Sequence, residues 1–160
     1  MIQPKGLFGR GNPPATAPEV SRRMRRVRRA STEPEQVLGA QLRQLGLRFQ
    51  VDQAPINSMR SRADIVFKSA RVAVFIDGCF WHGCPEHATW PATNADWWRA
   101  KIEANKSRDV RVTAALEESG WTVIRVWEHA VGAAARSVAE EVRRRQEGGS
   151  ISASPRARRN

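Results

Sequence analysis

The sequence predicts a single α/β domain in which helices flank a mixed β-sheet. Three observations lead to this fold class. Segments with apolar residues at helical spacing alternate with short runs rich in β-branched and aromatic residues, in the order helix, three strands, helix, strand, helix. The length of 160 residues suits one domain. The hydrophobic content of 41% is enough for one substantial core.

The predicted domain covers residues 31–147 and is preceded by two segments of different character. Residues 1–20 combine prolines and glycines without an apolar period, so we expect a flexible lead. Residues 21–30 form a basic arm around Met24, which is either solvated or lies on DNA. On DNA, Met24 could act as an apolar wedge in the minor groove. The arm residues expected at phosphates include Arg22, Arg23 and Arg25.

The domain is expected to begin with a helix. Thr32 can cap this helix and Glu35 follows at the spacing of a capping box, which gives Glu35 a structural role without any catalysis. Gly46 is expected to end the helix. Its predicted apolar stripe consists of Val37, Leu38, Leu42 and Leu45. A strand is expected over residues 48–51, followed by a loop over residues 52–62.

Two β-rich runs follow, over residues 63–68 and 72–77, and a hairpin is the natural connection between them. If the hairpin loop has two residues, Asp64 lies opposite Phe75, and Asp77 is the diagonal neighbour on the same face. Two carboxylates then share one side of the sheet. A three-residue loop would instead place them on opposite faces. On the simpler interpretation, each aspartate merely begins or ends a strand in solvent.

The second half of the domain alternates helix and strand. Residues 96–118 have helical spacing, and Gly120 ends this predicted helix. Residues 121–127 are expected to form another buried strand, and residues 132–147 a last helix. Residues 148–160, which are rich in serine, glycine and arginine, are expected to form a flexible basic tail.

The composition favours a polyanionic partner. The formal net charge is +11, and basic side chains that neutralise phosphates gain affinity by releasing condensed counterions. Nucleic acid is the first candidate, and an anionic membrane surface is the alternative. The sequence has no apolar run of transmembrane length and no signal-peptide pattern at its start. We therefore expect a cytoplasmic protein.

Both cysteines of the chain lie in a C-x4-C-x2-H pattern formed by Cys79, Cys84 and His87. His129 follows the last predicted strand. Two thiolates and two imidazoles satisfy a tetrahedral zinc ion without an open position, as structural zinc sites require. The alternative is a pair of buried thiols with two surface histidines. A zinc ion would explain how the loop over residues 78–96 stays folded with so few aliphatic side chains.

The same loop supplies His82, five residues beyond Asp77. This histidine could act as a general base or hold a water molecule near a metal ion, although a lone histidine is often only a satisfied polar residue. Phe80, Trp81 and Trp98 are large aromatic residues in and after the loop. They either belong to the core or stack on bases and wedge into a base step.

Two sequence blocks are specific enough to indicate a family: FIDGCFWH at residues 75–82 and GWTVIRVWE at residues 120–128. With them, the chain resembles the very short patch repair (Vsr) DNA mismatch endonucleases over about residues 20–130. Other matching positions are Met24-Arg25, Glu35, residues 63–66, residues 91–98 and Lys101-Ile102.

This resemblance implies a core similar to that of type II restriction enzymes, the PD-(D/E)xK nucleases. It also implies a magnesium-dependent nick on the 5′ side of the thymine in a T:G mismatch, which arises when 5-methylcytosine deaminates. The expected partner is mismatched double-stranded DNA, bound by a monomer at the bacterial nucleoid. Mismatch-repair proteins are further expected partners on the same basis.

The resemblance also implies roles for individual residues. Asp64 would bind magnesium, His82 would lie at the scissile phosphate, and Glu35 would be a supporting acid. The residues that match intercalating positions are Met24, Phe80, Trp81 and Trp98. The residues on or near the zinc positions are Cys79, Cys84, His87 and His129.

The chain departs from the best-known family pattern at several positions. Ile76 and Asp77 stand where that pattern has threonine and histidine. A carboxylate at Asp77 looks like the second acid of the wider nuclease superfamily, so we expect Asp77 to help hold magnesium. His129 stands where a cysteine is usual, but a tetrahedral zinc ion accepts either atom. The lysine of the superfamily motif is absent, because its position is Cys79.

Two other functions fit the same residues. One is a zinc-stabilised DNA-binding protein without catalysis, and the other is a restriction-type nuclease that cuts both strands. Asp64, Asp77 and His82 favour a nuclease over a binding protein, because acidic groups lower the affinity for a phosphate backbone unless a cation lies between them.

Overall fold

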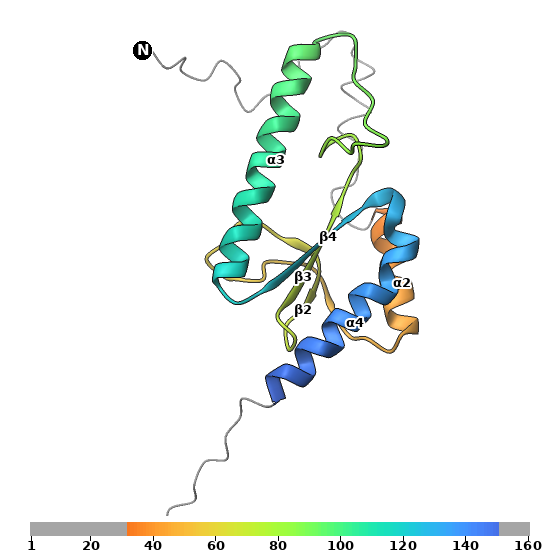
Figure 1. The fold of residues 1–160 in the computed structure, drawn as a ribbon, viewed down its shortest axis with the longest axis vertical. Helices are drawn as coiled ribbons and strands as arrows, with labels where there is room; N and C mark the ends of the chain where they lie inside the picture. The colour runs from red at the N-terminus through yellow and green to blue at the C-terminus, as the bar shows by residue number, and fades with distance from the viewer. Residues whose placement is uncertain (1–31, 151–160) are drawn as a thin grey trace, which may run out of the picture.

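The protein contains a mixed four-stranded sheet in which the strands lie in the order β1-β2-β3-β4. The computed structural model describes residues 32–150 (Figure 1). Strands β1, β2 and β3 pair antiparallel, whereas β3 and β4 pair parallel. In chain order, the elements are α2 (Glu33–Gln44), β1 (Gln50–Gln53), β2 (Ala63–Phe67), β3 (Val72–Asp77), α3 (Ala95–Glu118), β4 (Thr122–Trp127), the 3-10 helix η1 (Glu128–Ala130) and α4 (Val131–Ser150). This order confirms the predicted α/β class with a mixed sheet and flanking helices.

The β2–β3 hairpin has the register expected for a two-residue loop. Ile65 pairs with Val74, so the preceding residue Asp64 lies opposite Phe75. Because side chains alternate between the faces of a strand, Asp77 is on the same face as Phe75. The prediction that the two aspartates share one side of the sheet is therefore confirmed.

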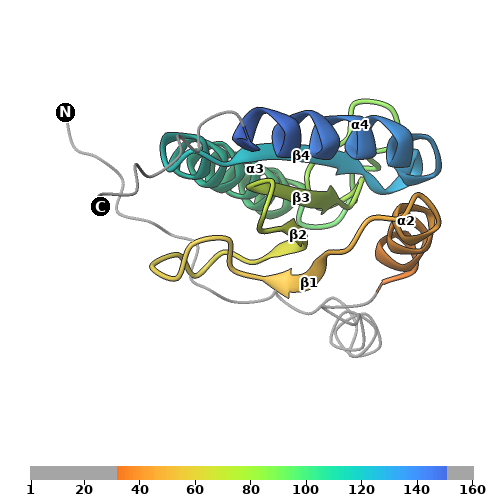
Figure 2. The ribbon, with the colours of Figure 1, turned by 90° about the horizontal axis from the view of Figure 1, so that it is seen from below.

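Helices cover both faces of the sheet. Figures 1 and 2 show α2 and α4 side by side, and on their face Leu38 and Val138 belong to one buried cluster with alternate residues of β2 and β3. On the other face, α3 contributes Leu116 to a second cluster with Val66 and Phe75. Strands β2 and β3 are thus buried on both sides, which explains their nearly continuous apolar sequence. The two aspartates are on the α3 face.

The first helix begins after Thr32 and ends before Gly46, whose φ of 78° is in the left-handed region that glycine adopts readily. The expected capping box differs in detail, because the Thr32 hydroxyl donates to Glu35 Oε1 at 2.8 Å and makes no hydrogen bond to the helix backbone. Val37 was predicted in the apolar stripe, but it is 39% exposed. The stripe that packs on α4 is narrower, and Leu42 lies at its centre.

Three elements differ from the predictions in their bounds or their burial. Strand β1 begins at Gln50 and includes Asp52 and Gln53, which were expected in a loop. Strand β4 was expected to be buried, but Val126 is its only buried residue because β4 lies at an edge of the sheet. Helix α4 continues to Ser150, beyond the expected end at residue 147.

Several predictions concern segments outside the described residues. These are the flexible lead over residues 1–20, the basic arm over residues 21–30 and, of the tail predicted over residues 148–160, the part from residue 151 onward. The arm residues Met24, Arg22, Arg23 and Arg25 belong to this group. Within residues 32–150, none of the helices combines the length and the hydropathy needed to cross a membrane.

Candidate active site and metal centre

The parallel pairing of β3 with β4 brings two distant segments of the chain to one edge of the sheet. Asp77 pairs with Trp127, and each is the last residue of its strand. Cys79 and His129 each follow a paired residue by two positions, so they leave the sheet at the same edge. The candidate site lies here, beyond the carboxyl ends of β3 and β4, which is where open α/β sheets place their ligands.

Cys79, Cys84, His87 and His129 form one cluster, in which the potential ligand atoms lie within 4.8 Å of one another. The Cys79 Sγ atom is 3.1 Å from His129 Nδ1. The Cys84 Sγ atom is 3.8 Å from His87 Nδ1 and 3.9 Å from His129 Nδ1. Zinc bonds of about 2.0–2.3 Å place tetrahedral ligand atoms roughly 3.3–3.8 Å apart, so this donor set fits a zinc ion.

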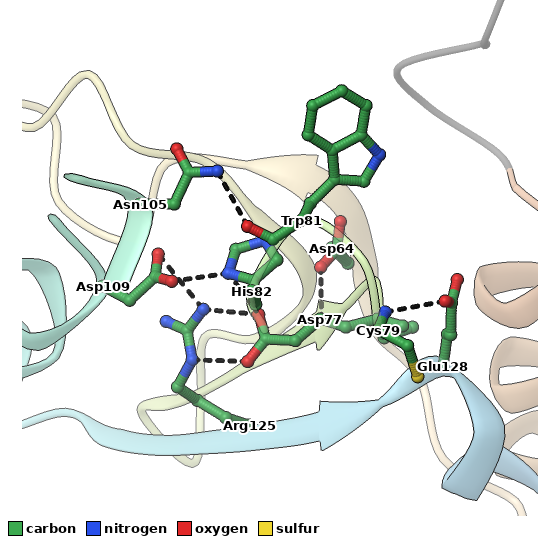
Figure 3. A network of polar contacts seen from close by, with 10 residues as sticks. Asp64, Asp77, Cys79, Trp81, His82, Asn105, Asp109, Arg125 and Glu128 are labelled. Carbon is green, nitrogen blue, oxygen red and sulfur yellow. Dashed lines mark hydrogen bonds and ion pairs between the residues drawn. The ribbon is translucent and has the colours of Figure 1, made fainter. Parts of the chain in front are cut away.

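The surroundings of the cluster also suit a metal ion. Both cysteines are buried, and burial raises the pKa of the Cys79 thiol to about 11, so a thiolate there would need a cation beside it. The backbone N–H of Cys79 donates to Glu128 Oε1 at 2.7 Å (Figure 3). His129 Nε2 is 3.8 Å from Glu86 Oε2, on the far side of the ring from the sulfur atoms. Contacts of this kind orient ligand residues at metal sites.

Asp64, on β2, is a half-buried carboxylate that lies on the α3 face of the sheet. Its Oδ2 atom accepts a hydrogen bond of 2.6 Å from the backbone N–H of Ile76. Burial raises the pKa of Asp64 to about 6, and the negative charges of Glu35 and Asp77 contribute in the same direction. This environment disfavours an isolated anion at Asp64 and would be relieved by a bound cation.

His82 points toward α3 and contacts Asp109 on that helix (Figure 3). His82 Nδ1 lies 2.5 Å from Asp109 Oδ2 and 3.6 Å from Asp77 Oδ1. In a neutral imidazole, a carboxylate partner at Nδ1 favours the tautomer that carries its proton there, which leaves the lone pair on Nε2. The turn that follows β3 is closed by a hydrogen bond of 3.1 Å from the backbone N–H of His82 to the Gly78 carbonyl.

Asp77 is paired with an arginine that the sequence analysis did not single out. Arg125 Nε donates to Asp77 Oδ2 at 2.8 Å, and Arg125 Nη2 donates to Asp77 Oδ1 at 2.5 Å. The same Nη2 atom is 3.3 Å from Asp109 Oδ1. The expectation that Asp77 helps to hold magnesium did not include this bidentate ion pair.

Asp64, Asp77 and His82 line one cavity of about 460 Å³ on the α3 side of the sheet. The structure therefore brings together the acidic and imidazole groups that the sequence pointed to. The basic residues around the same cavity are Arg60, Arg62, Arg108 and Arg125. A hollow with carboxylates at its centre and guanidinium groups around it can accept a phosphate together with a cation.

The aromatic residues next to the cavity pack on one another at steep ring angles. The ring centroid of Phe80 is 5.2 Å from that of Trp81 and 5.1 Å from that of Trp98. Trp97 packs edge-on against Trp98 at 4.8 Å. Trp98 is only 6% exposed, whereas Phe80 and Trp81 are half-buried. Trp98 was predicted as an intercalating residue, but in this structure it lies beneath the other two rings and supports them.

Sequence reasoning missed Asn105, Asp109 and Arg125. The buried residues Trp98, Ile102 and Leu116 define the inner stripe of α3, and its helical spacing includes positions 105 and 109. Polar residues on an otherwise apolar stripe were therefore an available signal. Arg125 is the one charged residue within the apolar strand β4. Its partners could not be identified without the parallel pairing of β3 with β4.

The known proteins that this chain resembles form one consistent group. A family model described as DNA mismatch endonuclease Vsr matches residues 15–87. The type II nicking enzyme V.NaeI of Lentzea aerocolonigenes is 45% identical over 111 residues, which cover 68% of this chain and 67% of that protein. The type II nicking enzyme V.XorIIP of Xanthomonas oryzae is 40% identical, over 66% of this chain and 76% of that protein. The DNA mismatch endonuclease Vsr of Escherichia coli is 37% identical, over 69% of this chain and 70% of that protein.

Proposed function

The chain belongs to the DNA mismatch endonuclease Vsr family, and from this premise we propose that it nicks DNA on the 5′ side of the thymine in a T:G mismatch. Its relatives are DNA-cleaving endonucleases, so a DNA-binding role without catalysis is set aside. The observation that carries the proposal is the cavity in which Asp64 and His82 lie together, beside a loop with Phe80 and Trp81.

Asp64 is the proposed carboxylate ligand of a catalytic magnesium ion. When bound, this ion would neutralise charge on the scissile phosphate and polarise a water molecule. Asp64 suits the role because its carboxylate is half-buried and has the negative charges of Glu35 and Asp77 nearby. In this proposal the core is restriction-endonuclease-like, with Asp64 as its first acid and Glu35 as a supporting acid.

His82 is the proposed general base. Its Nδ1 atom is engaged by Asp109 at 2.5 Å, which leaves Nε2 to take a proton from the attacking water. Asp109 thereby fixes both the orientation of the ring and the position of its proton. Arg60 and Arg108 at the cavity would contact the phosphates on either side of the cut.

We assign mismatch recognition to the aromatic loop, which is the loop after β3 that carries Phe80 and Trp81. Phe80 and Trp81 present partly exposed rings that can enter a base step, while the buried Trp98 holds them from below. The Asn105 side chain donates from Nδ2 to the Trp81 carbonyl at 2.8 Å, which anchors the loop to α3 (Figure 3). A preformed wedge lowers the entropic cost of distorting a weakly paired site.

A structural zinc ion completes the proposal, held by the cluster of Cys79, Cys84, His87 and His129. It would clamp the loop that carries the aromatic residues and His82 to the end of β4. That the protein acts as a monomer at the bacterial nucleoid stays a prediction from the family. Its association with mismatch-repair proteins is a prediction on the same basis.

The proposal is tested with strand-labelled duplexes that differ only in one T:G pair. The protein is incubated with Mg²⁺ and with each duplex, and both strands are followed on a denaturing gel. We expect a single nick 5′ of the mismatched thymine and no cut in the matched duplex. Asp64→Asn should remove nicking while mismatch binding persists or tightens, because a negative charge beside the phosphate is lost.

Glu140→Gln serves as the matched control, because Glu140 is an exposed acid on α4 and its loss should leave nicking unchanged. Cleavage of both strands at a matched site would support a restriction-type nuclease instead. Equal nicking of matched and mismatched duplexes would contradict mismatch specificity, and activity in Asp64→Asn would contradict the role of Asp64.

A further inference from the structure

A basic hollow lies at the end of the sheet remote from the cavity that Asp64 and His82 line. This distal hollow has a volume of about 400 Å³ and lies between the β2–β3 turn and the last turns of α4 (Figure 1). Arg71 immediately precedes β3 and Asp77 ends it, so the cavity and the distal hollow are separated by the length of that strand. The residues that line the distal hollow are Ser69, Ala70, Arg71, Arg144, Arg145 and Gly148.

Two arginines from distant segments meet at Gly120, which lies between α3 and β4. Arg145 Nη2 donates a hydrogen bond of 3.1 Å to the Gly120 carbonyl. A Cβ atom at position 120 would be 3.3 Å from Arg71 Nη1, so the Arg71 guanidinium lies directly beside this glycine. The φ of Gly120 is 80°, a conformation that glycine adopts readily, and the missing side chain makes room for Arg71. Two positive charges are therefore gathered at one end of the sheet.

The backbone of Arg71 is held in an unusual conformation. Its φ of 50° is in the left-handed region, which residues with long side chains rarely adopt. The Arg71 carbonyl accepts a hydrogen bond of 2.8 Å from the backbone N–H of Thr122, at the start of β4. Its own N–H donates to the Lys68 carbonyl at 3.2 Å. Both ends of the residue are thus fixed, and the direction in which the side chain leaves the turn is fixed with them.

The positive charge of the distal hollow is only partly compensated. Arg144 donates hydrogen bonds of 2.6 and 2.8 Å to the two carboxylate oxygens of Glu141. Within residues 32–150, neither Arg71 nor Arg145 forms an ion pair, and none of the residues that line the distal hollow is acidic. Ser69 Oγ accepts a hydrogen bond of 3.4 Å from Gln146, which leaves the hydroxyl proton to donate to a ligand. Like charges gathered in this way favour a bound anion.

The distal hollow differs chemically from the cavity on the α3 side. Asp64, Asp77 and Asp109 line that cavity, and acidic groups accept a phosphate only with a cation between them. The distal hollow contains arginines without acids, so it can take a phosphate directly. It also offers no carboxylate to hold a metal ion and no imidazole to activate water. A phosphodiester bound there would be held and left intact.

We propose that the distal hollow binds the phosphodiester backbone of a second DNA segment, so that one protein molecule holds two duplexes at once. The distal hollow borders α4 and the cavity borders α3, and these helices cover opposite faces of the sheet. A straight duplex over the cavity therefore does not reach the distal hollow. An extended polyanion fits better than a small phosphate ion, because α4 is followed in the sequence by residues 151–160, which include three more arginines.

This second contact would change how the protein finds its target. A protein that holds two duplexes can pass from one to the other without a period free in solution, which shortens the search for a rare site. The inference goes beyond the proposed nicking reaction. It requires neither a mismatch nor Mg²⁺, because the contact is between guanidinium groups and phosphates.

The test is retention of a second duplex. Full-length protein is loaded on an immobilised matched duplex without Mg²⁺, and a fluorescent matched duplex is then added at several salt concentrations. The wild type should retain the fluorescent duplex. Arg71→Asn combined with Arg145→Gln should retain it roughly 10-fold more weakly, and the slope of log affinity against log salt should fall by about 2, since each phosphate contact contributes about 0.9. Asparagine is chosen because it tolerates the left-handed φ of this position.

Matched controls separate the distal hollow from general loss of charge. Arg136→Gln removes the same charge from an exposed position on the same helix as Arg145→Gln, and it should retain the second duplex as the wild type does. All variants should nick a short T:G duplex at the wild-type rate, because none of the changed residues lines the cavity. If the double variant does not fold, Arg145→Gln decides the question, with a fall in the salt slope of about 1.

A wild type that retains no second duplex would overturn the proposal, and so would variants that retain it fully. Sedimentation should show one protein with two duplexes, and two protein copies in the complex would overturn it as well. Release by millimolar inorganic phosphate would indicate a site for small anions instead. Release by polyglutamate as readily as by unlabelled DNA of equal charge would indicate an acidic protein partner. Failure to nick T:G duplexes would contradict the proposed function alone, since retention is measured on matched DNA.

Discussion

Cys79 Sγ lies 3.1 Å from His129 Nδ1, although the two residues are separated by 50 positions in the sequence. The register of two parallel strands produces this proximity, because it pairs Asp77 with Trp127, two positions before Cys79 and His129. The geometry of the candidate zinc cluster therefore depends on the pairing of β3 with β4.

For the metal cluster, we predict that one zinc ion co-purifies with the protein and that Cys84→Ala lowers stability more than it affects catalysis. Loss of one ligand weakens a clamp whose binding energy is coupled to folding, so the melting temperature should fall by roughly 10 °C. Elemental analysis and thermal unfolding measure the two effects. The wild type after chelation is the control, and its melting temperature should approach that of the variant. Folded, active protein without zinc would contradict this prediction.

For Asp64, we predict a pH-dependent effect on stability in metal-free buffer. Burial raises its pKa from 3.8 to about 6, so the folded protein binds this proton more tightly than the unfolded chain does. The ionised carboxylate therefore destabilises the fold. This destabilisation is absent below pH 3.8 and grows as the pH rises through 6, the pKa of Asp64 in the folded protein. Asp64→Asn should raise the free energy of unfolding by about 3 kcal/mol at pH 8 and have little effect at pH 4.

Urea unfolding at the two pH values measures this difference. Glu140→Gln, at an exposed position on α4, controls for the loss of one negative charge. Saturating Mg²⁺ should reverse the order at pH 8, because it would stabilise the wild type and not Asp64→Asn. An equal effect of the substitution at both pH values would mean that the carboxylate is not held in a buried, anion-disfavouring environment.

For the proposed base, we predict that His82→Ala slows nicking by roughly 10²–10⁴-fold with little change in affinity for the T:G duplex. Asp109→Asn should also slow nicking, by a smaller factor, because the imidazole remains but its orienting carboxylate is lost. Single-turnover kinetics separates the cutting step from binding. Equal rates for His82→Ala and the wild type would remove His82 from the proposed chemistry.

For the aromatic loop, we predict that Trp81→Ala reduces the preference for mismatched over matched DNA by roughly 10-fold, the worth of one stacked ring. Trp90→Ala is the matched control, since Trp90 is 51% exposed. It should leave the ratio of the two affinities unchanged. Titration of fluorescently labelled duplexes gives both affinities, and equal discrimination by Trp81→Ala and the wild type would count against intercalation by this residue.

Sequence reasoning succeeded where the determining interactions are local. The hairpin between β2 and β3 is tight, so its register followed from the alternation of side chains, and Asp64 lies opposite Phe75 as expected. That Cys79, Cys84 and His87 lie close together was accessible from their spacing in one loop, whereas zinc binding by their cluster stays a prediction. Helix α3 was found within one residue at its start, because its apolar spacing is regular over many turns.

Other parts of the site depend on pairings that local patterns do not contain. The ion pair of Asp77 with Arg125 requires the parallel register of β3 with β4, which no short segment encodes. The burial of Trp98 depends on how the aromatic loop folds over the start of α3. The predicted bounds of strand β1 were wrong because the strand is short and lies at the sheet edge, where few side chains are buried to fix its ends.

The last turns of α4 lie next to the β2–β3 turn, where Ser69 and Arg71 line one hollow together with Arg144 and Gly148. This turn is at the opposite end of β3 from Asp77 and the cavity that Asp64 and His82 line. A fluorescent reporter or a surface tether joined beyond α4 would thus start from the end of the sheet opposite the proposed nicking site. If the proposed site is correct, the enzyme could be immobilised there for single-molecule observation of nicking without covering the cavity.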